Sequence, residues 1–375
     1  MKKLDFNSYS LMVIVGSLLL IGIVVLTSVS TIYSQEKFNE PYYFLFRQII
    51  YILLGITAGF FSFKINLGFL KKWSSFILLL NIILLSLVFV PGLGFSAGGA
   101  KRWVQFGPAM IQPVEFLKIS FIIFFSAWMT KIPESLKGKN RKKSLRPIII
   151  TATLFLASIF ILWRQPDLSS LAMILAITLL IYFLSGTPVW HTVTLLVLST
   201  SIFAVIMFFS PHANNRINLF LNPEHDPMGL GYQTRQASIA IGSGGFFGLG
   251  LGMSKQKLGF LPETMSDTIF ATLAEETGFA GSLILLSLFI SFLFVGFKIS
   301  KNSADKFNSL VAAGITGWII IQAFVNMGAM LKLAPLTGIA LPFISYGGSH
   351  IIAELIAVGL LLNISKNRKN LIRIS

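Results

Sequence analysis

Ten long runs of apolar residues divide this chain, and each is long enough to cross a lipid bilayer. A spanning α-helix needs about 20 mostly apolar residues, because the hydrocarbon core is about 30 Å thick. A helix also satisfies its own backbone hydrogen bonds, which lipid cannot do, so these runs predict an all-α bundle of about ten transmembrane helices. The expected spans are Ser10–Tyr33, Tyr42–Phe63, Trp73–Val90, Pro113–Met129, Pro147–Trp163, Leu168–Ser185, Val189–Phe209, Thr268–Phe297, Phe307–Leu331 and Ile339–Ile364.

The composition agrees with a multi-pass membrane protein and excludes an ordinary soluble one. Of the 375 residues, 54% are hydrophobic and only 12% are charged, whereas soluble domains carry about 25% charged residues. The chain has no cysteine, so no disulfide or thiolate site is available. Four scattered histidines and the lack of a Walker loop give no sign of a metal site or of ATP-driven work.

The basic residues indicate the orientation of the chain in the membrane rather than binding of nucleic acid. The formal net charge is +16, and 19 of the 30 lysines and arginines fall in inner segments when the N-terminus is placed inside the cell. An excess of basic residues on the cytoplasmic side is the usual orientation signal. We therefore expect both termini to be cytoplasmic, with a basic cytoplasmic loop at residues 131–146 near anionic lipid headgroups.

The chain is expected to form a single transmembrane domain, residues 1–375, with two polar outer segments. The larger is the extracytoplasmic loop 210–267 between the seventh and eighth helices, whose nine glycines predict short, partly re-entrant pieces instead of one regular helix. The smaller, Pro91–Gln112, suits an interfacial turn or a short helix. A long polar loop at a membrane face is a common place for a substrate site.

Asp267 stands where the large outer loop meets the eighth span, and two interpretations fit it. An acidic residue at the start of a helix is an ordinary N-cap, a role open to Ser266 or Asp267. A carboxylate beside a polar outer loop also suits a general base whose pKa is tuned by its neighbours. The local sequence gives the two roles equal weight, and the position at the outer interface favours the second.

Charged residues inside or beside the other spans are costly in lipid unless they pair or face a polar cavity. Glu115 and Lys118 lie three residues apart on one face of the fourth span, so they either form an internal ion pair or line a cavity. Asp167 either caps the sixth helix or lines the same cavity. Glu275 lies about 80° around the eighth helix from Asp267, so it could line the same cavity as that residue.

The tenth span contains two unusual features. Glu354 is a carboxyl group within an apolar helix, and the sequence suggests no role for it. The segment Pro342–His350 interrupts the span with a proline and paired glycines, so its freed backbone groups are expected to face protein or a cavity rather than lipid.

Basic residues on the expected outer side form a third element. Positive charge outside a bilayer suits a diphosphate, because each cation stabilises the anion in a poorly hydrated setting. For any single residue, contact with lipid headgroups is an equally good alternative. The set comprises Arg102, Arg216, Arg235, Lys255 and Lys257.

Several blocks of the sequence together resemble a known family. They are GGAKRWVQFGPAMIQPVEFLK, RQPDL, DPMGLGYQTRQASIAIGSGGFFGLGLG, LPETMSDTIFATLAEETG and LTGIALPFISYGG, in this order along nearly the whole chain. The chain resembles the SEDS (shape, elongation, division and sporulation) family of FtsW, RodA and SpoVE type, and is somewhat closer to the division and sporulation branch. The resemblance implies a peptidoglycan glycosyltransferase that polymerises lipid II at the outer face of the bacterial cytoplasmic membrane, with a class B penicillin-binding protein as transpeptidase partner.

The resemblance also implies where the site lies. Asp267 matches the essential aspartate of the family and is the expected catalytic residue, while no cofactor is implied beyond an optional divalent cation, Mg²⁺ or Mn²⁺. The family pattern is altered at Gly259, at Met265, at Ser169–Ser170 and at His350. We expect substrate binding at Arg102, Glu115, Lys118, Asp167, Arg216, Gln233, Lys257 and Ser345.

The expected reaction is a single inverting displacement. Asp267 accepts the proton of the lipid II 4-hydroxyl as that oxygen attacks the anomeric carbon of a glycan on polyprenyl diphosphate. Two other classes of function remain open. A transporter that flips lipid II would also have ten helices with broken segments. A non-catalytic scaffold for the transpeptidase would explain the altered residues around Asp267.

Overall fold

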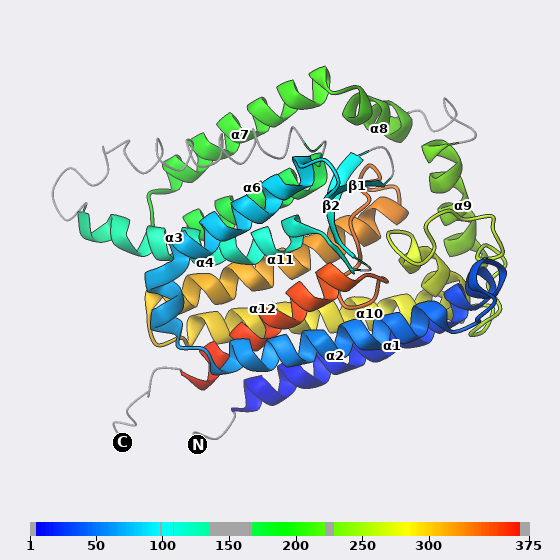
Figure 1. The fold of residues 1–375 in the computed structure, drawn as a ribbon, viewed down its shortest axis with the longest axis horizontal. Helices are drawn as coiled ribbons and strands as arrows, with labels where there is room; N and C mark the ends of the chain where they lie inside the picture. Colours follow the sequence, from blue (N-terminus) through cyan, green and yellow to red (C-terminus); the bar gives the residue numbers. More distant parts are fainter. Residues whose placement is uncertain are drawn as a thin grey trace.

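The structure is a bundle of long α-helices that lie side by side (Figure 1). It is a computed structural model that describes residues 5–97, 100–107, 109–135, 165, 167–221 and 229–367. Within these residues, eight helices are long and apolar enough to cross a membrane. The α-helices are α1 (Phe6–Phe38), α2 (Tyr43–Lys64), α3 (Leu67–Ser86), α4 (Pro113–Ser135), α6 (Leu168–Leu184), α7 (Val189–Phe209), α8 (Pro211–Leu221), α9 (Leu230–Ser243), α10 (Ile269–Lys301), α11 (Lys306–Met330) and α12 (Gly348–Lys366), and the 3₁₀ turn η1 (Leu87–Phe89) follows α3.

Each predicted span that falls within the described residues overlaps one of these helices, and the tenth starts later than predicted. The sixth span is α6, which has 17 residues and is shorter than the others. The fifth, Pro147–Trp163, lies outside the described residues, as does most of the loop 131–146. The tenth starts at Gly348 and not at Ile339, because Pro342 lacks the N–H that a helix needs and Gly347 has a non-helical conformation with a positive φ of 156° and ψ 139°.

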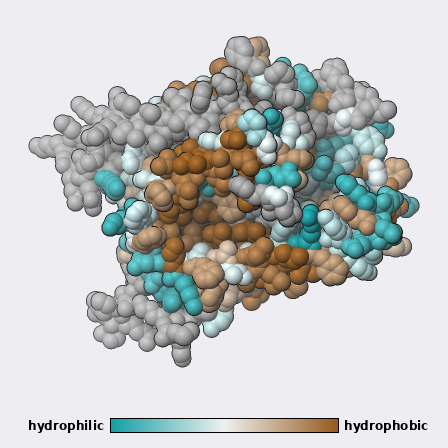
Figure 2. All heavy atoms as spheres, in the orientation of Figure 1, coloured by the Kyte–Doolittle hydropathy of each residue, from teal (hydrophilic) through white to brown (hydrophobic). Residues whose placement is uncertain are grey.

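Helix α11 lies inside the bundle and is buried along most of its length. It packs against α10, α6, α4 and α12, and Trp318 at its middle is fully buried. A helix that is apolar on all sides is expected to be enclosed by others. Helices α2 and α7 are the opposite case, since only 17% of the apolar window of each is buried. Figure 2 shows the resulting hydrophobic flank along the helices, with hydrophilic residues toward both ends.

The ends of the described chain meet at one end of the bundle. The Ser8 hydroxyl on α1 donates to the Ser365 hydroxyl on α12 at 3.0 Å, although the two residues are 357 positions apart. The first and last spanning helices therefore begin and end on the same side (Figure 1).

The outer segment Pro91–Gln112 forms a small antiparallel sheet, so the expected turn or short helix was wrong. Strands β1 (Gly94–Ala97), β2 (Ala100–Phe106) and β3 (Ala109–Ile111) pair in that order, with Val104 opposite both Gly94 and Ile111. Gly94 is required because a Cβ there would lie 1.9 Å from the Val88 carbonyl oxygen. A Gly-Gly pair between two such runs is a hairpin signal that the sequence interpretation missed.

The large outer loop contains short pieces, as its glycines predicted. After α8 and α9, residues 244–257 cross α10 beside Gly278, whose φ of 68° and ψ of −163° break the helix. The Leu249 N–H donates to Glu275 O at 3.0 Å, and the Phe279 N–H donates to Gly245 O at 2.9 Å. This backbone pairing joins the glycine-rich segment to the helix that follows Asp267.

Candidate active site

Asp267 lies in a turn immediately before α10 and does not cap that helix. The N-cap is Thr268, and α10 shows no side-chain cap in the described structure. The Asp267 carboxylate instead accepts a hydrogen bond from the Ser266 hydroxyl at 3.2 Å through Oδ1. The structure therefore contradicts the interpretation of Asp267 as the N-cap of α10.

Segments distant in sequence hold the backbone around Asp267. Asn326 of α11 donates through Nδ2 to Asp267 O at 2.7 Å and to Ile339 O at 2.8 Å. The Ser345 hydroxyl donates to Ser266 O at 2.5 Å and accepts the Leu341 N–H at 2.8 Å. The expected substrate-binding Ser345 therefore fixes the turn that carries Asp267, and its hydroxyl is already engaged twice by the protein.

Arg216 is the cation that faces Asp267. A Cβ on Gly338 would lie 3.7 Å from Asp267 Oδ2 and 3.9 Å from Arg216 Nη2, so both groups border the same point. The Arg216 guanidinium also donates to Thr337 O at 3.1 Å. Burial and the positive charge of Arg102 lower the pKa of Arg216, while the negative charges of Asp267 and Asp167 raise it. These four charged residues, from four different segments, therefore form one electrostatic cluster.

The pKa of the Asp267 carboxyl is closer to neutral pH than that of an ordinary aspartate. The pKa of its carboxyl is raised to about 6, mainly because of burial and also because of the negative charge of Glu263. The hydrogen bond from Ser266 and the positive charge of Arg216 act in the opposite direction. A carboxyl with this pKa is mostly ionised at pH 7 and can still bind a proton readily, which is the property that a general base needs.

Asp167 is the N-cap of α6, which was the structural alternative for it. Its carboxylate accepts the Ser170 N–H at 3.2 Å and the Ser170 hydroxyl at 2.8 Å. The neighbouring Ser169 hydroxyl donates to Thr337 O at 2.6 Å, so it shares that carbonyl with Arg216. The start of α6 is thereby held at the edge of the charged cluster.

Glu115 and Lys118 form a buried ion pair inside the bundle. Lys118 Nζ lies 2.8 Å from the Glu115 carboxylate and donates to Gln322 Oε1 at 3.0 Å. It also lies 5.0 Å from the centre of the Trp318 ring, whose N–H donates to the same Gln322 oxygen. The pair is thus enclosed by protein groups, as in the structural interpretation.

Lys257 and Glu275 lie where residues 254–257 meet α1 and α10. Lys257 Nζ is 3.0 Å from the Glu276 carboxylate and donates to the Ser28 hydroxyl at 2.7 Å. Glu275 accepts the Lys255 N–H at 3.0 Å and the Ser254 hydroxyl. The sequence allowed Glu275 to line the same cavity as Asp267, and in the structure residues 254–256 donate hydrogen bonds to its carboxylate.

Replacing Lys257 by methionine is expected to destabilise the protein. The two ionic side chains are almost completely buried, and removing one partner leaves an uncompensated charge at Glu276. Such a loss costs about 3–5 kcal/mol of unfolding free energy. Thermal unfolding in detergent would measure it, with the exposed Lys255→Met as a matched control within about 0.5 kcal/mol of the native protein. A higher KM at unchanged stability would instead mean that Lys257 binds substrate.

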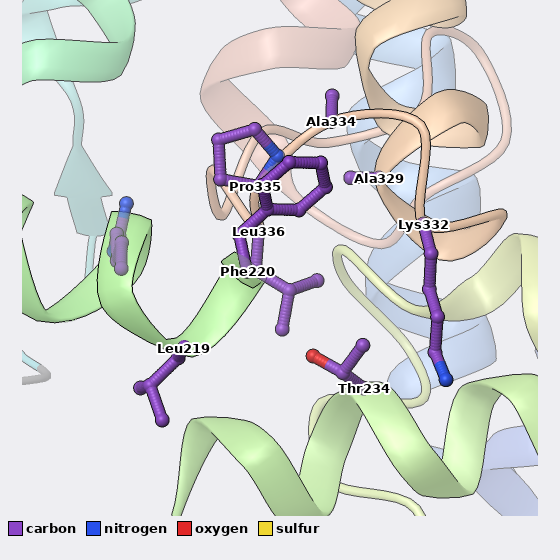
Figure 3. Close-up of a pocket in the computed structure, with 9 residues that line it drawn as sticks. Leu219, Phe220, Thr234, Ala329, Lys332, Ala334, Pro335 and Leu336 are labelled. Atoms are coloured by element: carbon purple, nitrogen blue, oxygen red, sulfur yellow. The ribbon is translucent and has the colours of Figure 1, made fainter. Parts of the chain in front are cut away.

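Arg216 also borders a small cleft of about 20 Å³, room for about one water molecule (Figure 3). Leu219 and Phe220 of α8, Thr234 of α9 and the chain after α11 form its other walls. Lys332, which the sequence analysis did not single out, stands at this cleft in a left-handed conformation with φ 58°. The cleft is too small to enclose a diphosphate.

The other predicted residues lie on β2 and α9. Arg102 is half-buried on β2, and its charge acts on Arg216. Gln233 is buried on α9, and its side-chain nitrogen has no hydrogen-bond partner among the described residues. No group of three or more possible metal ligands occurs in the described ranges.

Two larger apolar grooves open on the sides of the bundle. One, of about 570 Å³, lies between α3 and the helices α2, α4 and α12, and Leu84, Phe116 and Leu360 line it. The other, of about 520 Å³, lies between α9, α10 and α11, beside Gly278. Both have walls suited to hydrocarbon chains.

Comparison with known proteins finds similarity along nearly the entire chain. The model of the cell cycle protein family of FtsW, RodA and SpoVE matches residues 9–370. Stage V sporulation protein E of Bacillus subtilis is 36% identical, over 95% of this chain and 96% of that protein. The probable peptidoglycan glycosyltransferase FtsW of Nitrosomonas europaea is 39% identical, over 92% of this chain and 89% of that protein.

Solved structures show the same fold. A chain from a study of polymerization and crosslinking by a peptidoglycan synthase complex superposes with a TM-score of 0.79 at 26% identity, over 99% of this chain and 100% of that one. The rod shape determining protein RodA of Thermus thermophilus gives a TM-score of 0.71 at 24% identity, over 97% of both chains. The helical membrane architecture is therefore shared.

Proposed function

Because the chain belongs to the FtsW, RodA and SpoVE family of cell cycle proteins, we propose that it is a peptidoglycan glycosyltransferase that polymerises lipid II. It is a multi-pass protein of the bacterial cytoplasmic membrane. The observation that carries the site is the Asp267 carboxyl, with a pKa raised to about 6, which borders the same point as the Arg216 guanidinium.

The proposed reaction is one displacement at the anomeric carbon of the growing glycan. The 4-hydroxyl oxygen of lipid II forms the new bond to that carbon while Asp267 accepts the hydroxyl proton. The bond from the same carbon to the diphosphate breaks, and the polyprenyl diphosphate leaves with the electron pair. A single displacement inverts the carbon, so one base suffices and no covalent enzyme intermediate forms.

The arginines support the leaving group in this scheme. Arg216 and Arg102 act on each other electrostatically, which indicates that two positive charges are held close together beside Asp267. Asp267 and Asp167 offset part of this positive charge, and both guanidinium groups would stabilise the diphosphate as it leaves. The apolar grooves would accept the polyprenyl chains.

The proposed topology has ten spans in a single domain, with both termini in the cytoplasm. Eight long helices and α6 account for nine of the spans, and the apolar run Pro147–Trp163, fifth in chain order, is the remaining one. An even number of spans agrees with the contact between Ser8 and Ser365, which brings both ends of the described chain to one end of the bundle. The loop 210–267, with α8 and α9, then faces outward beside Asp267, where a class B penicillin-binding protein would supply the transpeptidase.

The activity of the native protein is expected to fall below about pH 6. Asp267 must be ionised to accept the proton, and protonation of its carboxyl with a pKa of about 6 removes the base. The value of kcat/KM should therefore drop about tenfold per pH unit on the acid side. Initial rates of glycan synthesis between pH 5 and 8 would test this, and a flat profile over that range would exclude Asp267 as the base.

Polymerisation of purified lipid II by the protein in detergent is the test of the function itself. Flipping needs a membrane, and a scaffold makes no product, so glycan formed in detergent would exclude both alternatives as the sole activity. The assay should be run with and without a cognate transpeptidase whose own active-site serine is blocked. No glycan under either condition would overturn the polymerase proposal and favour transport or scaffolding.

A further inference from the structure

A strained turn between α11 and α12 is held by a carboxyl group from inside the bundle. Phe343 has a φ of 64°, a left-handed conformation that is rare for a bulky aromatic residue. Its N–H donates to Glu354 Oε2 at 2.8 Å, and the Glu354 side chain is fully buried on α12. Conformations of this kind persist only where the surroundings enforce them.

The same turn carries the contacts that fix the backbone before Asp267. Two residues beyond Phe343, the Ser345 hydroxyl donates to Ser266 O at 2.5 Å. The next residue, Tyr346, donates its N–H to Met265 O at 2.8 Å. A change in the turn at Phe343 would therefore reach the peptide that precedes Asp267 through two short hydrogen bonds.

Other side chains hold the far part of the turn. Gln48 and His350 both contact Ser345 O, at 3.2 Å and 3.0 Å. On the near side, Gly22 of α1 packs so closely that a Cβ there would lie 2.8 Å from Phe343 O. Within the described part of the chain, Glu354 is the side chain that hydrogen-bonds the left-handed residue itself, so its loss would release that part of the turn.

We propose that Glu354 is a positioning residue for Asp267, an inference that rests on the proposed catalytic role of Asp267. A carboxyl group in a membrane helix is costly, and Glu354 Oε1 has no hydrogen-bond partner among the described residues. Packing alone would favour an apolar side chain at this position. The role of the Glu354 carboxyl is to accept the hydrogen bond from the Phe343 N–H. Because the same turn contains Ser345, this hydrogen bond also determines the position of the Asp267 carboxylate.

The test compares kcat and KM of polymerisation for variants at this one position. Glu354→Leu removes the acceptor and is expected to lower kcat on the order of 10- to 100-fold with KM within about twofold, as for a misplaced catalytic group. Glu354→Gln keeps an acceptor oxygen at the same reach and should retain near-native kcat. Glu354→Asp has a side chain shorter by one methylene and should behave like Glu354→Leu. If Glu354→Leu does not fold, the comparison of Glu354→Gln with Glu354→Asp provides the test.

Asn363→Leu is the matched control on the same helix. Asn363 is buried and donates to Ser62 O at 3.0 Å and to Ile65 O at 2.7 Å, near the end of α12 that lies away from Asp267. Its replacement is expected to lower thermal stability and leave kcat unchanged. Equal losses of kcat in Asn363→Leu and Glu354→Leu, or native kcat in Glu354→Leu, would overturn the positioning role.

Hydrogen exchange separates this inference from the proposed function. Amides of residues 264–268 and 341–346 are expected to exchange faster in Glu354→Leu than in the native protein, and to be unchanged in Asn363→Leu. If native protein makes no glycan, the polymerase proposal fails while the exchange result still tests the link from Glu354 to the Asp267 turn. Unchanged exchange in both segments would overturn that link.

Discussion

Substituting Asp267 by asparagine is expected to lower the rate of glycan polymerisation by about 10²–10⁴-fold, the usual contribution of a general base. Asparagine has nearly the same size and can keep the hydrogen bond from the Ser266 hydroxyl, which is 3.2 Å long in the native protein. It cannot accept the proton of the attacking hydroxyl. Turnover of purified lipid II in detergent, with the partner transpeptidase present, would measure the loss.

The Asp267→Asn protein is expected to be at least as stable as the native one. Because burial raises the pKa of Asp267 to about 6, the ionised carboxylate disfavours folding, and stability falls as the pH rises from about 4 to 6. Asparagine removes that dependence. Asp305→Asn is the control, because Asp305 caps α11 through the Asn308 N–H at 2.9 Å, at the helix end away from Asp267. Similar loss of activity in both variants would contradict the assignment of Asp267.

Replacing Arg216 by leucine is expected to have the second largest effect. The loss of a cation that stabilises developing charge typically costs about 10²-fold in rate. A second consequence follows from the direction of the pKa shift, since the positive charge of Arg216 lowers the pKa of Asp267. Without it, the acid limb of the pH profile should move to higher pH. Profiles of kcat/KM for the two proteins would show both effects.

Two further variants bear on Arg216. Arg216→Lys keeps the charge but not the planar guanidinium that also donates to Thr337 O, so its activity should be intermediate. Lys37→Leu removes an exposed cation at the end of α1, where the amine contacts the Tyr33 hydroxyl at 3.1 Å, and should leave the profile unchanged. An acid limb that stays in place in Arg216→Leu would show that the two groups are not coupled.

The helices could be predicted from the sequence because the length of an apolar run is a local property. The ends of the spans were less predictable, since the start of α12 depends on the turn that Glu354 and Ser345 hold from other elements. The sheet was missed because Val104 alone is fully buried among the sheet residues whose side chains the structure describes, so alternation gives little signal. The composition shows that the outer segments are polar and rich in glycine, but it does not show which of them forms a sheet and which forms helices.

The sequence identified several residues of the site, but it predicted less well which of them lie close together. Asp267 and Arg216 both stood out in the sequence, but their meeting depends on Thr337 and Gly338, which carry no charge to draw attention. Asn326, a polar residue in an apolar helix, was a signal that could have been used. Lys257 looked like part of the cationic set, and only the fold shows that Glu276 binds it.

The pairing of the glycine-rich segment with α10 uses backbone atoms on both sides, and this affects how the sequence can drift during evolution. A Cβ on Gly248 would lie 2.2 Å from Glu276 O, and one on Gly278 would lie 2.3 Å from the Gly248 nitrogen. By contrast, the side chains of Phe247 and Met253 are 81% and 65% exposed. Among orthologues, these two glycines should be conserved, while exposed positions of the same segment should vary. Sequence variation in the segment is therefore expected at every position except those where its backbone packs against α10.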